Sequence, residues 1–212
     1  MLLLTGCRGS SPRSRIAAIP ANTTEAVYVS EHAGLAREAA AHHLSVYWNG
    51  PNGEADISRQ VTLVQRAIRD HDFGIVLSPS APFALDTVVQ SALDHHIPVV
   101  VLGTPLHLPV EPGLSYVSND IARAGELAAQ RIHSIVGDEG EVAIVGIDPM
   151  NPGRVDHAHA FEAALSRQAP RVRIVSRLIG TFSWGQSERE VAQTLEEHPK
   201  IAAIYALTLN DV

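Results

Sequence analysis

Cysteine is nearly absent from this sequence: Cys7 is the single one in 212 residues. One thiol cannot form an internal disulfide, so the cysteine content says little about the redox compartment. Basic residues are not in excess, since the net charge is -7, and no basic helix or aromatic-basic stripe is found. This balance argues against a nucleic-acid partner. No apolar run approaches the roughly 20 residues of a membrane-spanning helix. The remaining composition, 45% hydrophobic and 18% charged, is typical of a soluble globular protein.

Signatures of catalysis and of metal binding are also missing. Residues 21–24 (ANTT), after the first predicted strand, lack the glycines of a phosphate-binding loop, and no Gly-x-Ser-x-Gly elbow supports a hydrolase. The pairs His42-His43 and His95-His96 lie at predicted helix ends, where attraction to the helix dipole explains them. His157 and His159 point to opposite sides of a helix, so they do not share a zinc ion. The sequence therefore predicts neither an enzyme nor a metal or cofactor site.

Short apolar runs alternate with helical patterns along most of the chain. Residues 73–79 (FGIVLSP) and 97–103 (IPVVVLG) are predicted strands, and apolar residues recur at helical spacing between them. Two such strands joined by a helix indicate a parallel sheet. Further predicted strands are 16–19, 46–48, 142–145, 172–175 and 201–207, and further helices are 25–42, 57–68, 121–135, 155–166 and 188–197.

The alternation is interrupted once, near Ser118, where residues 116–120 (YVSND) lead into a new helix. The pattern then restarts, which predicts an α/β fold of two similar, doubly wound parallel-sheet lobes. We expect a tether over residues 1–15, an N-terminal lobe over 16–117 and a C-terminal lobe over 118–212. Asp120 is expected either to mark the lobe crossing or to cap the following helix.

Several motifs in this order resemble the type I periplasmic binding proteins, which include ribose- and galactose-binding proteins and the ligand domains of lac-repressor-like regulators. The motifs are residues 97–102 (IPVVVL), 117–120 (VSND) followed by Gly125, 158–161 (AHAF), 181–182 (TF) and 198–206 (HPKIAAIYA). The resemblance implies a monomeric protein that holds a sugar or sugar-like molecule between two lobes and delivers it to the permease of an ABC-type importer. It also implies that the chain stops early, with the second lobe incomplete.

The resemblance assigns ligand-binding positions in the N-terminal lobe. Glu25, Val27 and Tyr28 align with an asparagine and two stacking phenylalanines of ribose-binding proteins, so only Tyr28 keeps the stacking role. Gly103 and Thr104 stand where the family has an aspartate that binds hydroxyl groups. Each has a structural alternative: Tyr28 as a core ring, Glu25 as a helix cap, and Gly103 as a tight turn.

In the C-terminal lobe the family's ligand-binding arginine aligns with His157, and Arg154 is a nearby substitute. Phe182 matches a position at which the family stacks a ring against the ligand. The asparagine that follows the last strand in the family aligns with Thr208 of this chain, close to Asn210. His157 and Phe182 have the alternative of ordinary packing. Because these positions differ in chemistry from the family pattern, no named sugar is transferred.

Residues 1–7 (MLLLTGC) resemble the end of a bacterial lipoprotein signal, in which the cysteine is acylated. The apolar stretch is shorter than a normal signal and has no basic start. Either the true start lies upstream or the match is chance, and we favour the lipoprotein reading. It predicts a protein in the periplasm or on the cell surface, anchored through Cys7. The alternatives to a solute-binding protein are the sensing domain of a lac-repressor-like regulator and an α/β enzyme.

Overall fold

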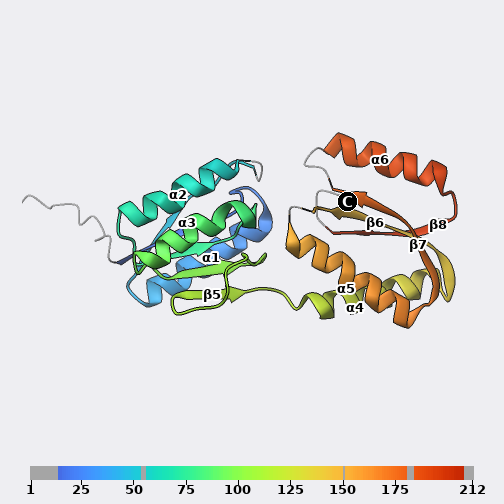
Figure 1. Ribbon diagram of the computed structural model, residues 1–212, viewed down its shortest axis with the longest axis horizontal. Helices are drawn as coiled ribbons and strands as arrows, with labels where there is room; N and C mark the ends of the chain where they lie inside the picture. Colours follow the sequence, from blue (N-terminus) through green and yellow to red (C-terminus); the bar gives the residue numbers. More distant parts are fainter. Residues whose placement is uncertain (1–13, 54–55, 150, 181–183, 208–212) are drawn as a thin grey trace, which may run out of the picture. The chain divides into compact units, whose positions relative to one another are not determined.

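The structure, a computed structural model, describes residues 14–53, 56–149, 151–180 and 184–207. The chain forms two compact units, Met1–Val117 and Ser118–Val212, which we call the N-terminal lobe and the C-terminal lobe. Each lobe is an α/β unit with a parallel sheet (Figure 1), and the predicted fold class is confirmed. No helix within the described ranges has the length and apolarity to cross a bilayer.

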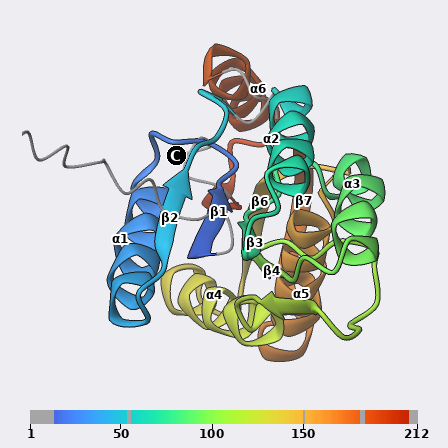
Figure 2. The same ribbon diagram turned by 90° about the vertical axis from the view of Figure 1, so that its left-hand side faces the viewer.

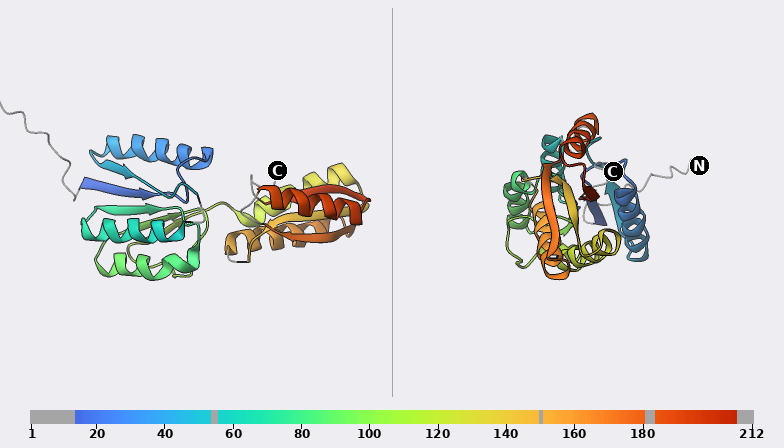
Figure 3. Two further views of the ribbon diagram at one scale, coloured as in Figure 1. Left: turned by 90° about the horizontal axis from the view of Figure 1, so that it is seen from above. Right: turned by 90° about the vertical axis from the view of Figure 1, so that its right-hand side faces the viewer.

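The N-terminal lobe has a five-stranded sheet in the order β2-β1-β3-β4-β5, with all neighbours parallel. Helix α1 covers one face of the sheet, while α2 and α3 cover the other (Figures 2 and 3). The strands are β1 (Arg15–Ile19), β2 (Ser45–Trp48), β3 (Gly74–Leu77), β4 (Val99–Leu102) and β5 (Leu114–Val117), and the helices are α1 (Ala26–Ala41), α2 (Ile57–Arg69) and α3 (Pro82–Asp94).

The core of this lobe lies between the sheet and helices α2 and α3. Alternate strand residues such as Ile75, Leu77 and Val99 are almost completely buried there, because successive side chains of a strand point to opposite faces. Burying each such side chain contributes about 1.5–3 kcal/mol. Strand β5 was not predicted. It has four residues and pairs only with β4, and its exposed Ser115 interrupts the apolar pattern.

The C-terminal lobe has a three-stranded parallel sheet in the order β7-β6-β8. Helices α4 and α5 lie on one face and α6 lies on the other (Figure 1). The core includes the fully buried Phe161, whose ring lies 4.4 Å from that of Tyr205. The strands are β6 (Glu139–Ile147), β7 (Arg171–Ile179) and β8 (Ile201–Ala206), and the helices are α4 (Ile121–Val136), α5 (Pro152–Gln168) and α6 (Trp184–Glu197).

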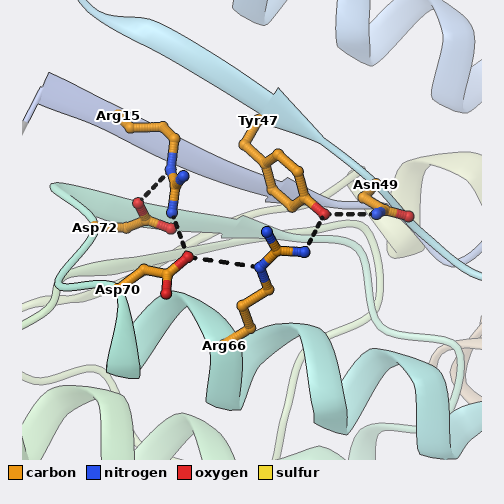
Figure 4. Close-up of polar contacts among 6 residues, drawn as sticks. All are labelled: Arg15, Tyr47, Asn49, Arg66, Asp70 and Asp72. Atoms are coloured by element: carbon orange, nitrogen blue, oxygen red, sulfur yellow. Dashed lines mark hydrogen bonds and ion pairs between the residues drawn. The ribbon is translucent and has the colours of Figure 1, made fainter. Parts of the chain in front are cut away.

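A charged network joins the start of β1 to α2 and β2 (Figure 4). Arg15 donates to Asp72 at 2.6 Å and to Asp70 at 2.8 Å, and Arg66 lies 3.5 Å from Asp70. Arg66 also donates to the Tyr47 hydroxyl at 3.1 Å. The network therefore fixes the first strand against the end of α2, on the side of the sheet where β1 begins.

Candidate functional site

The order of strands in the N-terminal lobe creates a crevice at one edge of its sheet. All five strands are parallel, so their carboxyl ends lie at the same edge. Strand β1 lies between β2 and β3. The connection from β1 to β2 therefore runs to one side of β1, and the connection from β2 to β3 crosses back to the other side. Open α/β sheets bind ligands at this point, outside the carboxyl ends of the strands. We therefore describe the loops that follow β1, β3 and β4 in turn.

Gln60 of α2 joins the loop after β1 to the loop after β3. It is fully buried, and its amide nitrogen donates to the carbonyl oxygens of Pro20 and Ser78, both at 2.9 Å. Its amide oxygen accepts from the backbone nitrogen and the hydroxyl of Ser80 at 3.0 and 2.9 Å. Every polar atom of the side chain is thus used, and the two loops at the crevice are fixed to each other.

The loop after β1 is ordered by Asn22, which is almost completely buried. Its side-chain oxygen accepts from the backbone nitrogens of Thr24 and Glu25, and its nitrogen donates to the Glu25 carboxylate at 2.7 Å. Glu25 is the N-cap residue of α1, but its side chain makes no capping hydrogen bond. The alternative role of Glu25 as a side-chain cap is therefore wrong, since its carboxylate is bound by Asn22.

A second carboxylate lies beneath the same edge. The Ser78 hydroxyl donates to Glu31 of α1 at 2.8 Å. The two residues line a cavity of ≈ 20 Å³ together with Trp48 and Leu102, which is room for about one water molecule. Burial raises the pKa of Glu31, and the hydrogen bond from Ser78 opposes that shift. The edge of the sheet therefore contains a partly buried acid next to a water-sized space.

The predicted N-terminal residues occupy this edge in different ways. Val27 and Tyr28 lie in the first turn of α1, with Val27 exposed and Tyr28 partly exposed. Gly103 and Thr104 directly follow β4. Gly103 has a φ of 78°, a conformation that glycine adopts without strain, and its nitrogen donates to Val117. The positive φ is compatible with the structural alternative for Gly103, and its ligand contact stays a prediction.

In the C-terminal lobe the carboxyl ends of the strands approach closely. A Cβ atom on Gly180 would lie 2.7 Å from the Cα of Gly146, so glycine is required for this contact. The side chain of Asn151 caps the neighbouring helix α5 by accepting from the Arg154 backbone nitrogen at 3.3 Å. His157, one turn further, is partly buried, and burial lowers its pKa. Arg154 and His157 therefore lie three residues apart at the start of α5.

Asp120 is the N-cap residue of α4, where its carboxylate accepts from the Arg123 backbone nitrogen at 2.9 Å. This contact accounts for the residue as a helix cap. Phe182, Thr208, Asn210 and Cys7 lie outside the described residues. In the described part of the chain, no group of three or more histidine, cysteine or acidic side chains is arranged to hold a metal ion.

Sequence reasoning missed polar residues that join the loops of the crevice: Asn22, Gln60 and Ser78, which are buried, and Glu31 and Ser80, which are partly buried. The apolar residues Ile57, Val61, Val64 and Ile68 recur at helical spacing, which predicts the inner face of α2. Val64 is fully buried, and Val61 and Ile68 pack against the core. The buried residues Gln60, Leu63 and Ala67 complete this face. The available signal in the sequence was Gln60, which directly precedes Val61 of the predicted apolar face. A glutamine buried at such a position needs hydrogen-bond partners for its amide group.

Comparison with known proteins identifies the family. A model described as a periplasmic binding protein domain matches residues 16–212. The chain belongs to this family. Among curated protein sequences, none matches significantly.

Solved structures of solute-binding proteins share the fold of this periplasmic binding protein domain. An ABC transporter solute-binding protein from Agrobacterium vitis, bound to α-D-tagatopyranose, has a TM-score of 0.83 and 22% identity. An ABC transporter periplasmic solute-binding protein from Actinobacillus succinogenes, with bound D-allose, has a TM-score of 0.82 and 21% identity. A sugar-binding protein of a sugar ABC transporter from Bacillus halodurans has a TM-score of 0.81 and 24% identity. In each case 93% of this chain is covered, but only 68%, 70% and 67% of the respective neighbour.

Proposed function

We propose that this chain is the binding component of an extracytoplasmic transport system, and that it captures a sugar or sugar-like small molecule for an ABC-type importer. The observation that carries the proposal is the match of residues 16–212 to the periplasmic binding protein domain. The three similar structures belong by name to ABC transport systems, and two contain a bound sugar. These names favour transport over the alternative of a regulator's sensing domain.

The chemistry of the N-terminal crevice supports a neutral ligand rich in hydroxyl groups. Its loops provide oxygen acceptors from Glu25 and Ser78, a hydroxyl from Thr104 and the ring of Tyr28. A sugar offers hydroxyl donors to the oxygens and an apolar face to the ring. The loops 20–25, 49–53, 78–81 and 103–104 contain no lysine or arginine. An anionic ligand would therefore find no cationic side chain in these loops.

Further parts of the proposal concern capture and location. We expect Arg154, His157, Phe182, Thr208 and Asn210 to contact the ligand from the C-terminal lobe. Contacts from both lobes would favour the closed form through a population shift. Acylation of Cys7 would hold the protein near the permease, in the periplasm or on the cell surface. No catalytic step is part of this proposal, since the family consists of binding proteins.

Thermal unfolding of the chain with a panel of pentoses, hexoses and polyols tests the proposal. A ligand present at about a hundred times its Kd should raise Tm by about 5–10 °C. Tyr28→Ala should reduce the shift, whereas Phe73→Ala should not, because Phe73 precedes β3 at the opposite edge of the sheet. A flat response to sugars with a response to amino acids or anions would overturn the sugar assignment. A flat response to every class would overturn ligand capture by this chain.

A further inference from the structure

Glu31 of α1 is a partly buried carboxylate that has no cation beside it. Its Oε2 accepts a hydrogen bond from the Ser78 hydroxyl at 2.8 Å. Its Oε1 makes no hydrogen bond or ion pair with any described residue. Burial raises the pKa of Glu31, and only the hydrogen bond from Ser78 opposes that shift. The carboxylate therefore keeps an unused acceptor at a place where its charge is poorly solvated.

Asp72, a buried acid of the same lobe, shows how a structural carboxylate is stabilised here. It forms an ion pair of 2.6 Å with Arg15, which is the usual arrangement for a buried charge. Glu31 has only a serine hydroxyl. A neutral acceptor would satisfy Ser78 equally well, so the fold does not account for the charge of Glu31.

The water-sized cavity beside Glu31 lies at the carboxyl ends of four strands. It is lined by the last residues of β1, β2 and β4 and by Ser78, the first residue after β3. Ligands of open α/β sheets bind at this edge. The other described lining residues are Ala18, Ile19, Pro20, Leu35, Trp48, Val76 and Leu102. Apart from the indole nitrogen of Trp48 their side chains are apolar, so Glu31 is the one charged group among them.

The groups around this cavity are already fixed by contacts within the lobe. The Trp48 ring is stacked on His32, with ring centroids 4.4 Å apart and an interplanar angle of 14°. The Ser78 carbonyl oxygen accepts from Gln60 at 2.9 Å. Groups held in place in this way lose little further conformational freedom when a ligand binds.

Glu31 and Ser78 both present acceptors to the cavity. An ionised carboxylate only accepts hydrogen bonds, and the single proton of the Ser78 hydroxyl is donated to Glu31. The free positions on both side chains are therefore lone pairs. A ligand group that enters the cavity has to supply the donor.

We propose that Glu31 is a ligand-binding residue whose carboxylate accepts a hydrogen bond from a hydroxyl group placed in this cavity. The inference rests on the proposed function and specifies which group of the ligand is recognised at this point. A hydroxyl fits because it is a donor and is about the size of the water molecule for which the cavity has room. A carboxylate or phosphate would be repelled by Glu31, and a methyl ether would lack the donor.

Isothermal titration calorimetry of the whole chain tests this residue with the pentoses and hexoses of the panel, among them D-ribose, D-glucose and D-galactose. Glu31→Gln keeps an acceptor for Ser78 and removes the charge. It should weaken binding of the tightest sugar about tenfold, because hydrogen bonds to charged groups are stronger than those to neutral groups. The matched control is Glu38→Gln, an exposed acid on the same helix, which should leave the affinity unchanged.

Single-deoxy derivatives of the tightest sugar separate a ligand contact from a structural role. The derivative that lacks the hydroxyl in the cavity should bind the unmodified chain at least about tenfold more weakly than the parent sugar. It should bind the Glu31→Gln variant as well as it binds the unmodified chain. Every other deoxy derivative should still distinguish the two chains. The melting temperature without ligand shows that the variant is folded.

Three results would count against the inference. Equal affinity of the unmodified chain and the Glu31→Gln variant for every sugar would overturn it and leave the proposed function intact. An equal loss for the parent sugar and all its deoxy derivatives would give Glu31 a structural role and would also overturn it. No binding of any sugar or polyol to the unmodified chain would overturn the proposed function together with the inference.

Discussion

Arg15 and Asp72 form an ion pair that joins the first strand to the turn before β3. The Arg15 Nε lies 2.6 Å from Oδ1 of Asp72, whose side chain is only 1% exposed. Oδ2 of Asp72 is buried and has no hydrogen-bond partner among the described residues. Burial raises the pKa of Asp72, and the hydrogen bond from Arg15 opposes this shift. The carboxylate is therefore held in the lobe mainly by its arginine.

Replacing Asp72 by alanine should destabilise the N-terminal lobe by about 2 kcal/mol, because Arg15 loses its most buried partner. The loss is smaller than for a fully buried pair because Asp70 still binds Arg15. Urea unfolding measures the change. Glu126→Ala, which removes the exposed pair with Arg123, should cost less than about 0.5 kcal/mol. Equal losses for the two variants would contradict this ranking.

Gln60→Met should destabilise the chain by about 1–3 kcal/mol, because it leaves the Pro20 and Ser78 carbonyl oxygens without their donor. If the proposed function holds, ligand affinity should also fall, since the two crevice loops are no longer joined. Gln60→Glu should be worse for stability than Gln60→Met. It places a carboxylate against the same two carbonyl oxygens. Calorimetry for affinity and urea unfolding for stability separate these effects.

Glu31→Gln should change how stability depends on pH. Because burial raises the pKa of Glu31 above its ordinary 4.5, the folded state binds more protons than the unfolded state as pH rises through that range. Stability of the wild type therefore falls as Glu31 ionises. Glutamine can still accept from Ser78, so the variant should gain in relative melting temperature from acid towards neutral pH. A constant difference in melting temperature across this range would disprove the assignment.

His157→Gln should change the pH dependence of stability in the opposite direction to Glu31→Gln. Burial lowers the pKa of His157 below its ordinary 6.5, so the unfolded state binds more protons as pH falls below that value. Wild-type stability should then decrease on acidification. The variant should lose less stability between neutral and mildly acidic pH, as measured by thermal unfolding. His159→Gln, an exposed neighbour on the same helix, is the control and should follow the wild type.

Gly125→Ala should strongly destabilise the C-terminal lobe. A Cβ atom there would lie 2.5 Å from the carbonyl carbon of Ala160 and 2.7 Å from the Phe161 nitrogen, so α4 would have to move away from α5. We expect a loss of about 1–3 kcal/mol or more. Gly34→Ala in α1 is the matched control, since nothing lies within 4 Å of its added carbon. It should stabilise the helix by about 0.5–1 kcal/mol, and a loss there would contradict the argument.

The alternation of apolar runs and helical spacing predicted nearly every described strand and helix. Residues 97–103 were assigned as a strand from their short apolar run, and β4 (Val99–Leu102) lies within them. Strand β5 was missed because an edge strand pairs on one side only and has too few buried residues to leave a pattern. On α2, Gln60 was missed because a polar residue at a core position does not appear in an apolar pattern.

Local patterning of the chain was enough to predict its parallel sheets and the order of its helices. These features depend on residues close in sequence, whose spacing decides which face is buried. Only the tertiary structure decided that Gln60 joins Pro20 to Ser78 and that Glu31 reaches Ser78. The partners in these hydrogen bonds are 18 to 47 residues apart in the sequence. Such contacts follow from strand order and register, which bring distant residues together and which no local pattern encodes.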